Sequence, residues 1–453
     1  MKHISRRDFL KASGAMIGAA AVAGCAQPAP TAAPAATTAP AAAATTAPAA
    51  PAAASIQGTK LTYFGGNPAV GAEEWRKAVT DCMASKGVEV SIENVAQAEW
   101  SAKLATMAET QQGADIVELF ANDVPVNTPA LLDITDIADE IGARNGGWYA
   151  GPKSVALQNG KMVALPMYIY AQYWHWRMDL FKEAGVETWP ETWEDLHQVG
   201  KKLKANGFPV GFVLGHAGTD GNTHCLSLLW SYGGKEFNKD GSVALDSPET
   251  LNCLEFFKDF YNDACSPDTF SWTEAGNNQA YNSKQISATN NAVSIYQGLL
   301  KNDPPLAEIT GLGGALKGPA GAFQMMNSLY IGIPTYSKNV DAAKALLKEC
   351  IFDPNMQFLG SFTKLTNAYV LPPFGGLENN PNTWPTDPKL ASAPTLGKDA
   401  RAPGYEGPFT KIVGQSMNKY IVIDMFAKVA QGTAPKDAIS WAVNEINVLI
   451  KGA

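Results

Sequence analysis

The chain has 453 residues, 46% of them hydrophobic, which is enough to bury more than one core, and its formal net charge at pH 7 is −8. Without the four basic residues and the one acidic residue among the first 25, this charge becomes −11, which disfavours a nucleic-acid partner. No apolar run beyond the N-terminal segment is long enough to cross a bilayer.

The N-terminal segment, residues 1–25, is typical of an export signal. Adjacent Arg6 and Arg7 precede an apolar stretch that is rich in Ala and Gly and too short for a transmembrane helix. This stretch ends in Val-Ala-Gly directly before Cys25, which has the form of a lipobox. We therefore interpret it as a twin-arginine lipoprotein signal, with cleavage before Cys25 and a diacylglycerol on its thiol.

A linker over residues 26–57 follows the signal. It consists mainly of Ala, Pro and Thr, a composition that cannot bury a core and favours extended conformations. At about 3.1 Å per residue, such a tether reaches roughly 90 Å when fully extended. The function must therefore lie in the part of the chain that begins near residue 58.

The next part of the chain alternates between strand and helix patterns. We expect strands at residues 60–64, 88–95 and 115–120, and helices at residues 72–85 and 98–112. Such alternation implies a parallel sheet covered on both faces, with ligands beyond the carboxyl ends of its strands. Further helices are predicted at residues 192–204, with a Thr192 cap, and at residues 248–262, 341–351 and 436–450.

Five cysteines lie beyond the lipobox, and an odd number cannot all pair within one molecule: Cys82, Cys225, Cys253, Cys265 and Cys350. A bridge between Cys253 and Cys265 is disfavoured, because the helix at residues 248–262 holds them apart. Twin-arginine export generally carries proteins that have already folded in a reducing compartment. We therefore expect free, buried thiols.

Motifs for catalysis are missing from the sequence. It has no phosphate-binding glycine loop, no His-Glu-x-x-His pair and no Gly-x-Ser-x-Gly elbow. Four residues close together could ligate zinc, namely His216, Asp220, His224 and Cys225. Because no helical His-x-x-x-His or Cys-x-x-Cys clip accompanies them, we favour a polar loop with hydrogen-bonding side chains. We expect a protein without a metal or cofactor that is not an enzyme.

Aromatic residues are frequent where loops are expected, around residues 168–176 and at Trp230 and Tyr369. Flat rings stack on the apolar faces of sugars, while Asn, Asp and Gln bind the hydroxyls. The alternative is that the rings belong to the core, which we prefer for four tryptophans: Trp174, Trp176, Trp189 and Trp193. For Tyr168, Tyr170 and Trp230, both interpretations stay open.

Three consecutive motifs carry a family resemblance. Residues 160–166 have the form G-K-x-x-x-x-P, residues 179–185 the form D-L-F-x-x-A-G, and residues 190–196 the form P-x-T-W-x-x-L. In these motifs the chain resembles the family 1 extracellular solute-binding proteins of ABC importers, the maltose-binding type. The likeness extends over about residues 58–450.

The resemblance implies an α/β, two-lobed periplasmic-binding-protein fold of type II. Its lobes are joined by a three-crossing hinge, expected here near residues 167–171, 290–293 and 331–335. One lobe would comprise residues 58–168 with 292–331, and the other residues 169–291 with 332–453.

It also implies where the ligand binds. The positions that match are Gly66, Asn67, Asn122, Asp123, Tyr168, Tyr170, Trp230, Asn290, Asn291, Asn327 and Tyr369. One departure affects the ligand, because residues 286–293 lack the glycine and the stacking tryptophan common in the family.

The function implied is that of an extracytoplasmic, lipid-anchored protein that captures a carbohydrate-like solute by hinge closure. Its partners would be the solute, a membrane permease with its ATPase, and the membrane through the anchor. Two alternatives are a non-sugar solute, such as a polyamine or a polyol phosphate, and a tethered carbohydrate-active enzyme. Carboxylates around the rings would indicate a cationic ligand, and Arg or Lys an anionic one.

Overall fold

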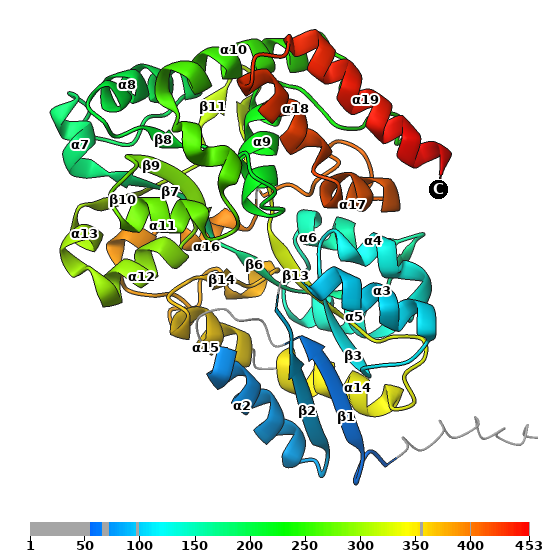
Figure 1. Ribbon diagram of the computed structural model, residues 1–453. Coiled ribbons are helices and arrows are strands. Elements are labelled where there is room, and N and C mark those ends of the chain that lie inside the picture. Colours follow the sequence, from blue (N-terminus) through cyan, green and yellow to red (C-terminus); the bar gives the residue numbers. More distant parts are fainter. Residues whose placement is uncertain (1–54, 66–71, 97–98, 354–356, 399, 453) are drawn as a thin grey trace, which may run out of the picture. The chain divides into compact units, whose positions relative to one another are not determined.

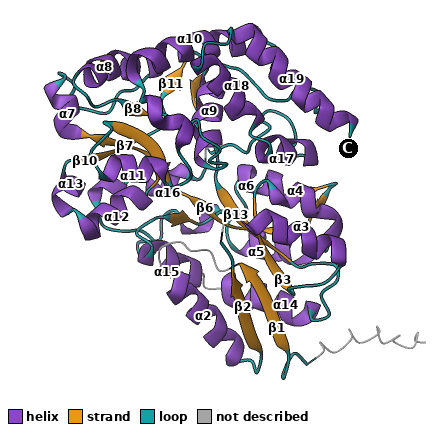
Figure 2. Ribbon diagram, viewed as in Figure 1, coloured by secondary structure: helices purple, strands orange, loops and turns teal. Residues whose placement is uncertain are grey.

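The computed structural model describes residues 55–65, 72–96, 99–353, 357–398 and 400–452. The signal at residues 1–25 and most of the linker at residues 26–57 therefore lie outside the described residues. From residue 54 onward the chain forms one compact unit that contains two larger mixed sheets, each accompanied by helices (Figures 1 and 2). We call the part around the six-stranded sheet the first lobe and the part around the four-stranded sheet the second lobe.

The sheet of the first lobe has the strand order β14-β6-β13-β3-β1-β2. Its strands are β1 (Lys60–Gly65), β2 (Glu89–Asn94), β3 (Ile116–Phe120), β6 (Leu165–Tyr170), β13 (Ser328–Gly332) and β14 (Val370–Leu371). The predicted parallel arrangement is confirmed for β2, β1 and β3. The other three strands pair antiparallel, so the sheet is mixed.

Helices cover this sheet and pack on one another. They are α2 (Ala72–Ala84), α3 (Trp100–Thr110), α4 (Asp123–Asn127), α5 (Thr135–Arg144), α6 (Ala150–Ala156), α14 (Val340–Leu346), the π-helical η4 (Leu347–Ile351) and α15 (Gln357–Leu365). The predicted strands and helices between residues 60 and 120 are confirmed, as is the helix predicted at residues 341–351.

The sheet of the second lobe has the strand order β10-β7-β9-β8. Its strands are β7 (Gln172–Arg177), β8 (Val210–Gly211), β9 (Ala288–Ala292) and β10 (Thr310–Gly313). Strand β7 is buried along its whole length, and Trp174 stacks on Trp189 with ring centroids 5.4 Å apart. The prediction that these tryptophans are core residues is confirmed for Trp174, Trp176 and Trp193, which are buried, and Trp189 packs against them.

The helices of the second lobe are α7 (Met178–Glu183), α8 (Trp193–Ala205), α9 (Asp220–Ser231), α10 (Pro248–Ala264), α11 (Gly276–Asn282), α12 (Ser294–Asn302), α13 (Pro304–Glu308), α17 (Lys411–Asn418), α18 (Ile421–Ala430) and α19 (Pro435–Lys451). The predicted Thr192 cap is confirmed, since its side chain accepts the Asp195 N–H at 3.0 Å. Helix α17 also contacts α4 of the first lobe.

Short elements complete the described chain. They are the hairpins β4 (Leu157–Gln158) with β5 (Lys161–Met162) and β11 (Lys317–Gly318) with β12 (Gly321–Ala322), helix α16 (Ala393–Leu396), and the 3-10 turns η2 (Thr128–Ala130), η3 (Pro267–Ser271), η5 (Gly375–Leu377) and η6 (Pro388–Leu390). No helix among the residues described combines the length and the apolar character needed to cross a membrane.

The crossings between the sheets differ in part from the expectation. The first lies at Ala171, between β6 and β7 and within the expected residues 167–171. At residues 290–293 the chain does not leave the second lobe, because β9 leads through α12 and α13 into β10, which pairs with β7. The chain returns to the first sheet only between β10 and β13.

The third crossing also lies later than expected. After β13 the chain does not cross at residues 331–335, because it continues through α14 to β14 in the first sheet. It contacts the second lobe from η6 onward, where Lys389 Nζ donates to the Thr310 carbonyl of β10 at 2.7 Å, and continues through α17 to α18, which packs against α9 and α10 (Figure 1). The strand pairing therefore differs from the expected division into residues 58–168 with 292–331 and residues 169–291 with 332–453. Strand β10 belongs to the second sheet and β14 to the first.

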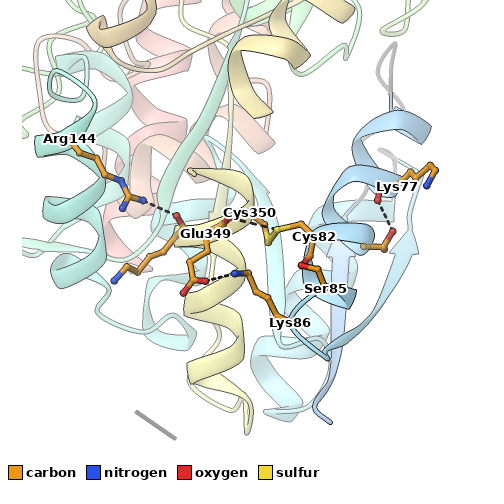
Figure 3. Close-up of a disulfide and its surroundings, with 9 residues drawn as sticks. Lys77, Cys82, Ser85, Lys86, Arg144, Glu349 and Cys350 are labelled. Carbon is orange, nitrogen blue, oxygen red and sulfur yellow. Dashed lines mark hydrogen bonds and ion pairs between the residues drawn. A yellow bond between two sulfur atoms is a disulfide. The ribbon is translucent and has the colours of Figure 1, made fainter. Parts of the chain in front are cut away.

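A disulfide in the first lobe joins Cys82 of α2 to Cys350 of η4, with Cα atoms 5.9 Å apart (Figure 3). The expectation of free thiols is wrong for these two cysteines. It is confirmed for Cys225, Cys253 and Cys265, which are free and buried. The sequence hides the bridge because its cysteines are 268 residues apart and meet only when α2 and η4 pack together.

Replacement of Cys82 by Ser is expected to lower the free energy of unfolding by about 2–5 kcal/mol, because the bridge restricts a very long loop in the unfolded chain. Denaturant unfolding of the mature protein, monitored by circular dichroism, measures the loss. Reductant should destabilise the wild type to a similar extent and leave Cys82→Ser unchanged. Identical unfolding midpoints for the wild type with and without reductant would contradict the bridge.

Candidate ligand-binding site

A cavity of about 240 Å³ is built from residues of both lobes. Its lining consists of aromatic rings, carboxylates, amides and hydroxyls: Trp100, Phe120, Tyr170, Gln172, Thr219, Asp220, Glu274, Ala275, Asn278, Asn291, Ala292, Ser294, Asn327 and Tyr369. No Lys, Arg or His is among these lining residues.

Strand ends position much of this lining. Strand β3 ends at Phe120, β6 ends at Tyr170, β7 begins at Gln172 and β9 ends at Ala292. The two sheets meet at Ala171, so these ends from both lobes converge there. A crevice beyond strand ends, between two lobes, is where ligands usually bind in α/β proteins.

Two pairs of rings contribute to the wall of the cavity. The Tyr170 and Tyr369 rings meet edge to face with centroids 5.2 Å apart. The Trp100 and Phe120 rings, from the first lobe, have centroids 5.3 Å apart. Backbone hydrogen bonds fix the main chain that carries the first pair, because the Tyr170 N–H donates to Asn327 O at 2.8 Å and the Ala171 N–H to Tyr369 O at 3.1 Å.

Polar groups occupy the side formed by the second lobe. The Asn291 amide nitrogen lies 2.9 Å from Asp220 Oδ2, 3.0 Å from Asn277 Oδ1 and 2.6 Å from Asn278 Oδ1. This amide connects the end of β9 to the starts of α9 and α11. It thereby fixes the orientation of the carboxylate of Asp220.

Glu274 lies next to Asp220 at the start of α9. Its carboxylate accepts the Thr219 N–H at 2.9 Å, the Asp220 N–H at 3.4 Å and the Thr219 hydroxyl. Burial, and next the neighbouring Glu274 charge, raise the pKa of Asp220 well above its ordinary value. The pKa of the Tyr369 hydroxyl is also raised, chiefly by burial and then by the two carboxylates.

Four of the predicted site residues line the cavity: Tyr170, Asn291, Asn327 and Tyr369. Asn290 is adjacent and buried, and its amide nitrogen donates to Gln324 Oε1 at 3.4 Å. Tyr168 is also buried, with its ring centroid 5.4 Å from that of Tyr170. These two residues therefore flank the lining.

Asn122 and Asp123 lie outside the lining. The Asn122 amide donates to Asn418 Oδ1 of α17 at 2.7 Å, a contact between the lobes. Asp123 Oδ1 accepts the Ser101 hydroxyl at 2.7 Å, and Oδ2 accepts the Phe120 N–H at 3.2 Å. Burial raises the pKa of Asp123 to about 6, partly offset by these two hydrogen bonds. Gly66, Asn67 and Cys25 lie outside the described residues.

The four candidate zinc ligands do not converge. His216 Nε2 lies 2.9 Å from Asp424 Oδ1, whereas His224 Nδ1 faces Asp220 O at 2.9 Å and its Nε2 accepts the Asn290 N–H at 3.3 Å. Cys225 is buried. No group of three or more potential ligands that could hold a metal occurs in the described part of the chain.

Several lining residues were not predicted: Trp100, Phe120, Gln172, Thr219, Glu274, Asn278 and Ser294. Gln172 lies between two aromatic runs directly after the first crossing, and Asn278 belongs to an Asn-Asn pair ahead of β9. Both are polar residues at points where the chain changes direction, and this feature of the sequence could have identified them as site residues. The glycine-rich loop around Asp220 indicated a metal ligand at most, and not a contact to an organic solute.

Comparison with known proteins is consistent with this geometry. The family profile of bacterial extracellular solute-binding proteins matches residues 65–357, and that of the twin-arginine translocation signal matches residues 3–23. The fold and the cavity between its lobes are those of a periplasmic-binding-protein architecture. The chain belongs to the bacterial extracellular solute-binding protein family, and its twin-arginine signal indicates an extracytoplasmic location.

Individual relatives match parts of the chain that differ in length. A probable ABC transporter-binding protein of Deinococcus radiodurans is 24% identical over 66% of this chain and 73% of its own length. A binding protein of Brucella abortus (strain 2308) is 31% identical over 24% of this chain, and the match spans 27% of that relative. The arabinooligosaccharide-binding protein of Bacillus subtilis is 31% identical over 23% of this chain and 24% of its own length.

Solved structures confirm the fold over nearly the whole described chain. The maltose-bound MalE3 of T. maritima has a TM-score of 0.69 at 20% identity and covers 86% of this chain and 100% of its own. The cyclic alpha-maltosyl-1,6-maltose binding protein of Arthrobacter globiformis has a TM-score of 0.72 at 20% identity, with 87% and 100% covered. The predicted two-lobed α/β fold is thus confirmed.

Trp230 lies away from the cavity lining. Its side chain is 1% exposed near the end of α9, and its ring centroid is 5.8 Å from that of Tyr405. It is not one of the lining residues. This placement favours the core interpretation of Trp230 over the role of a stacking platform.

Replacement of Trp230 by Ala is therefore expected to cost about 3–5 kcal/mol of folding stability, because it leaves a large hole in a packed core. Affinity for the solute in the surviving folded fraction should be unchanged. Denaturant unfolding and calorimetric titration of the same variant measure the two quantities. A variant of wild-type stability that binds five- to two-hundred-fold more weakly, an effect of about 1–3 kcal/mol, would instead make Trp230 a ligand contact.

Proposed function

We propose that this protein is the substrate-binding component of an ABC importer, which captures a sugar-sized, polyhydroxylated solute outside the cytoplasmic membrane and delivers it to a permease. The observation that carries this proposal is the cavity at the crossing between the sheets, whose rings and amides come from both lobes. Rings stack on the apolar faces of such solutes, and amide and carboxylate groups bind their hydroxyls. The sugar ligands named for the structural neighbours support the same class.

Closure of the two lobes around the solute is the proposed mechanism. Contacts that form only when both lobes engage the ligand stabilise the closed state, and the permease recognises that state. Two contacts between the lobes would change as the lobes open and close. They are the Asn122 to Asn418 hydrogen bond and the close approach of Gly414 to the Asn122 carbonyl. A micromolar affinity corresponds to about −8 kcal/mol, within reach of stacked rings and several hydrogen bonds.

A lipid anchor at Cys25 and the absence of enzymatic activity are part of the proposal. The lipobox motif supports the anchor, and the family's role in binding rather than catalysis supports the second point. Oligosaccharides incubated with the mature protein should therefore remain intact, as chromatography of the mixture would show.

Replacement of Cys25 by Ser is expected to release the protein from the membrane fraction, because it removes the thiol that carries the lipid. Fractionation of cells followed by immunoblotting measures the distribution. The matched control is Cys82→Ser, which removes a different cysteine and should stay with the membranes. Retention of Cys25→Ser in a detergent-sensitive, membrane-bound form would argue against the anchor.

Replacement of Asn327 by Ala is expected to weaken solute binding by about 1–2 kcal/mol, roughly five- to thirty-fold, through loss of a hydrogen bond to the ligand. A thermal-shift screen of sugars, polyols, amines and peptides first identifies the solute. Calorimetry then compares Asn327→Ala with Asn238→Ala, whose exposed side chain lies in a distant turn. Equal affinities of the two variants would remove Asn327 from the site.

A further inference from the structure

Two carboxylates face the cavity without a cation beside them. Asp220 and Glu274 both belong to the lining, and no Lys, Arg or His does. Within the described ranges, neither carboxylate takes part in an ion pair, although many surface carboxylates of the chain do. Asp220 is buried and Glu274 is half-buried, and negative charge withdrawn from water is costly unless a partner compensates for it.

Neutral donors satisfy these carboxylates only in part. Glu274 is held by the first turn of α9, through the N–H groups of Thr219 and Asp220 and the Thr219 hydroxyl. Asp220 Oδ2 accepts from the Asn291 amide at 2.9 Å. These contacts fix both carboxylates in place and leave the charge facing the cavity uncompensated.

The side-chain oxygen of Gln172 is a third hydrogen-bond acceptor in the lining. Gln172 is only 5% exposed, and its Oε1 finds no hydrogen-bond partner in the part of the chain that the structure describes. A buried, unpaired acceptor costs free energy unless a ligand or water supplies the missing hydrogen. Together with Asp220 and Glu274, it makes the polar part of the site a set of acceptors that requires a ligand rich in N–H or O–H donors.

The aromatic rings narrow the choice between these donors. Tyr170 with Tyr369 and Trp100 with Phe120 place four π systems in the wall of the same cavity. The faces of such rings attract an ammonium group electrostatically, and charge-assisted hydrogen bonds to carboxylates are the strongest that an ammonium N–H makes. A neutral hydroxyl lacks the attraction to the rings and makes a hydrogen bond in which only the carboxylate is charged, and a phosphate would be repelled by both carboxylates.

We propose that the solute carries a protonated amine, which binds at Asp220 and Glu274 beside the rings of Tyr170 and Tyr369. This inference rests on the proposed capture function and specifies its substrate class. The shared chemistry is an alkylammonium group, whether it belongs to an amino sugar or to a linear polyamine. A polyol phosphate is disfavoured because the lining has no basic side chain.

The proposed ammonium site also predicts how the affinity for an amine depends on pH. Burial and the Glu274 charge raise the pKa of Asp220, and an ammonium ligand beside it would favour its ionised form. The other groups at this position do not supply a positive charge: burial lowers the pKa of His224 to about 4, and the Tyr369 hydroxyl stays protonated because its pKa is raised. Affinity for a fully protonated amine should therefore increase with pH as the Asp220 carboxyl loses its proton.

Matched ligand pairs test the inference by calorimetry on the full mature protein: glucosamine against glucose, and 1,4-diaminobutane against 1,4-butanediol. We expect one amine to bind at least about tenfold more tightly than its hydroxyl counterpart. Asp220→Asn should weaken that amine by about tenfold or more and remove the pH dependence, while Asp246→Asn, an exposed carboxylate elsewhere, should change neither. Preferential binding of glucosamine would indicate an amino sugar, and preferential binding of 1,4-diaminobutane would indicate a polyamine.

Other outcomes separate this inference from the function on which it rests. Equal binding of a sugar and its amine, unaffected by Asp220→Asn, would overturn the ammonium site and leave solute capture intact. The ammonium site is likewise overturned if the broad thermal-shift screen finds only neutral ligands, whereas an amine found there supports the inference. No ligand in any class would overturn solute capture itself. The unliganded melting temperature of Asp220→Asn, expected to equal or exceed that of the wild type at pH 7, shows that the variant is folded.

Discussion

The constraint on which this structure depends is a single buried residue between two strands of different sheets. Ala171 separates β6 from β7, and its backbone is bound on both sides. Its N–H donates to Tyr369 O at 3.1 Å, next to β14 of the first sheet, and its carbonyl accepts the Val293 N–H at 3.1 Å, next to β9 of the second. One residue thus holds four strand ends together, and the cavity opens where they meet.

This arrangement explains why the site contains both rigid and adjustable groups. The backbone hydrogen bonds around the crossing fix the main chain that carries the Tyr170 and Tyr369 rings. Asp220 begins α9 and Glu274 lies in the turn before α11 in the second lobe, whereas Trp100 and Phe120 come from the first. A ligand that touches all of them gains its full set of contacts only when the lobes are together, which makes closure depend on the ligand.

Sequence reasoning succeeded where the signal is local. The alternation over residues 60–120 and the Thr192 cap follow from side-chain periodicity and short-range hydrogen bonds, and both were predicted correctly. Tyr170, Asn291, Asn327 and Tyr369 were also placed among the candidates, and the fold brings them to one cavity.

It failed where the deciding contact is distant in the chain. Cys82 meets Cys350 across 268 residues, and Glu274 meets Asp220 across 54. The position of the second crossing depends on β10 pairing with β7, a ladder between residues more than a hundred positions apart. For Trp230 the sequence left both roles open, because a ring before a turn has the same local pattern whether it faces a ligand or the core, and its burial away from the cavity lining favours the core.

The disulfide illustrates how covalent rigidity and hinge motion can coexist. Cys82 and Cys350 both lie in the first lobe, and the neighbouring Lys86 to Glu349 ion pair at 2.5 Å joins the turn after α2 to η4 (Figure 3). Arg144 of α5 adds hydrogen bonds to the carbonyls of Lys348 and Phe352 at 2.8 and 2.7 Å. Because all of these links lie within the first lobe, they stiffen it without crossing to the second. In the proposed closure, the first lobe can therefore move as one body against the second lobe, which contributes Asp220 and Glu274 to the cavity.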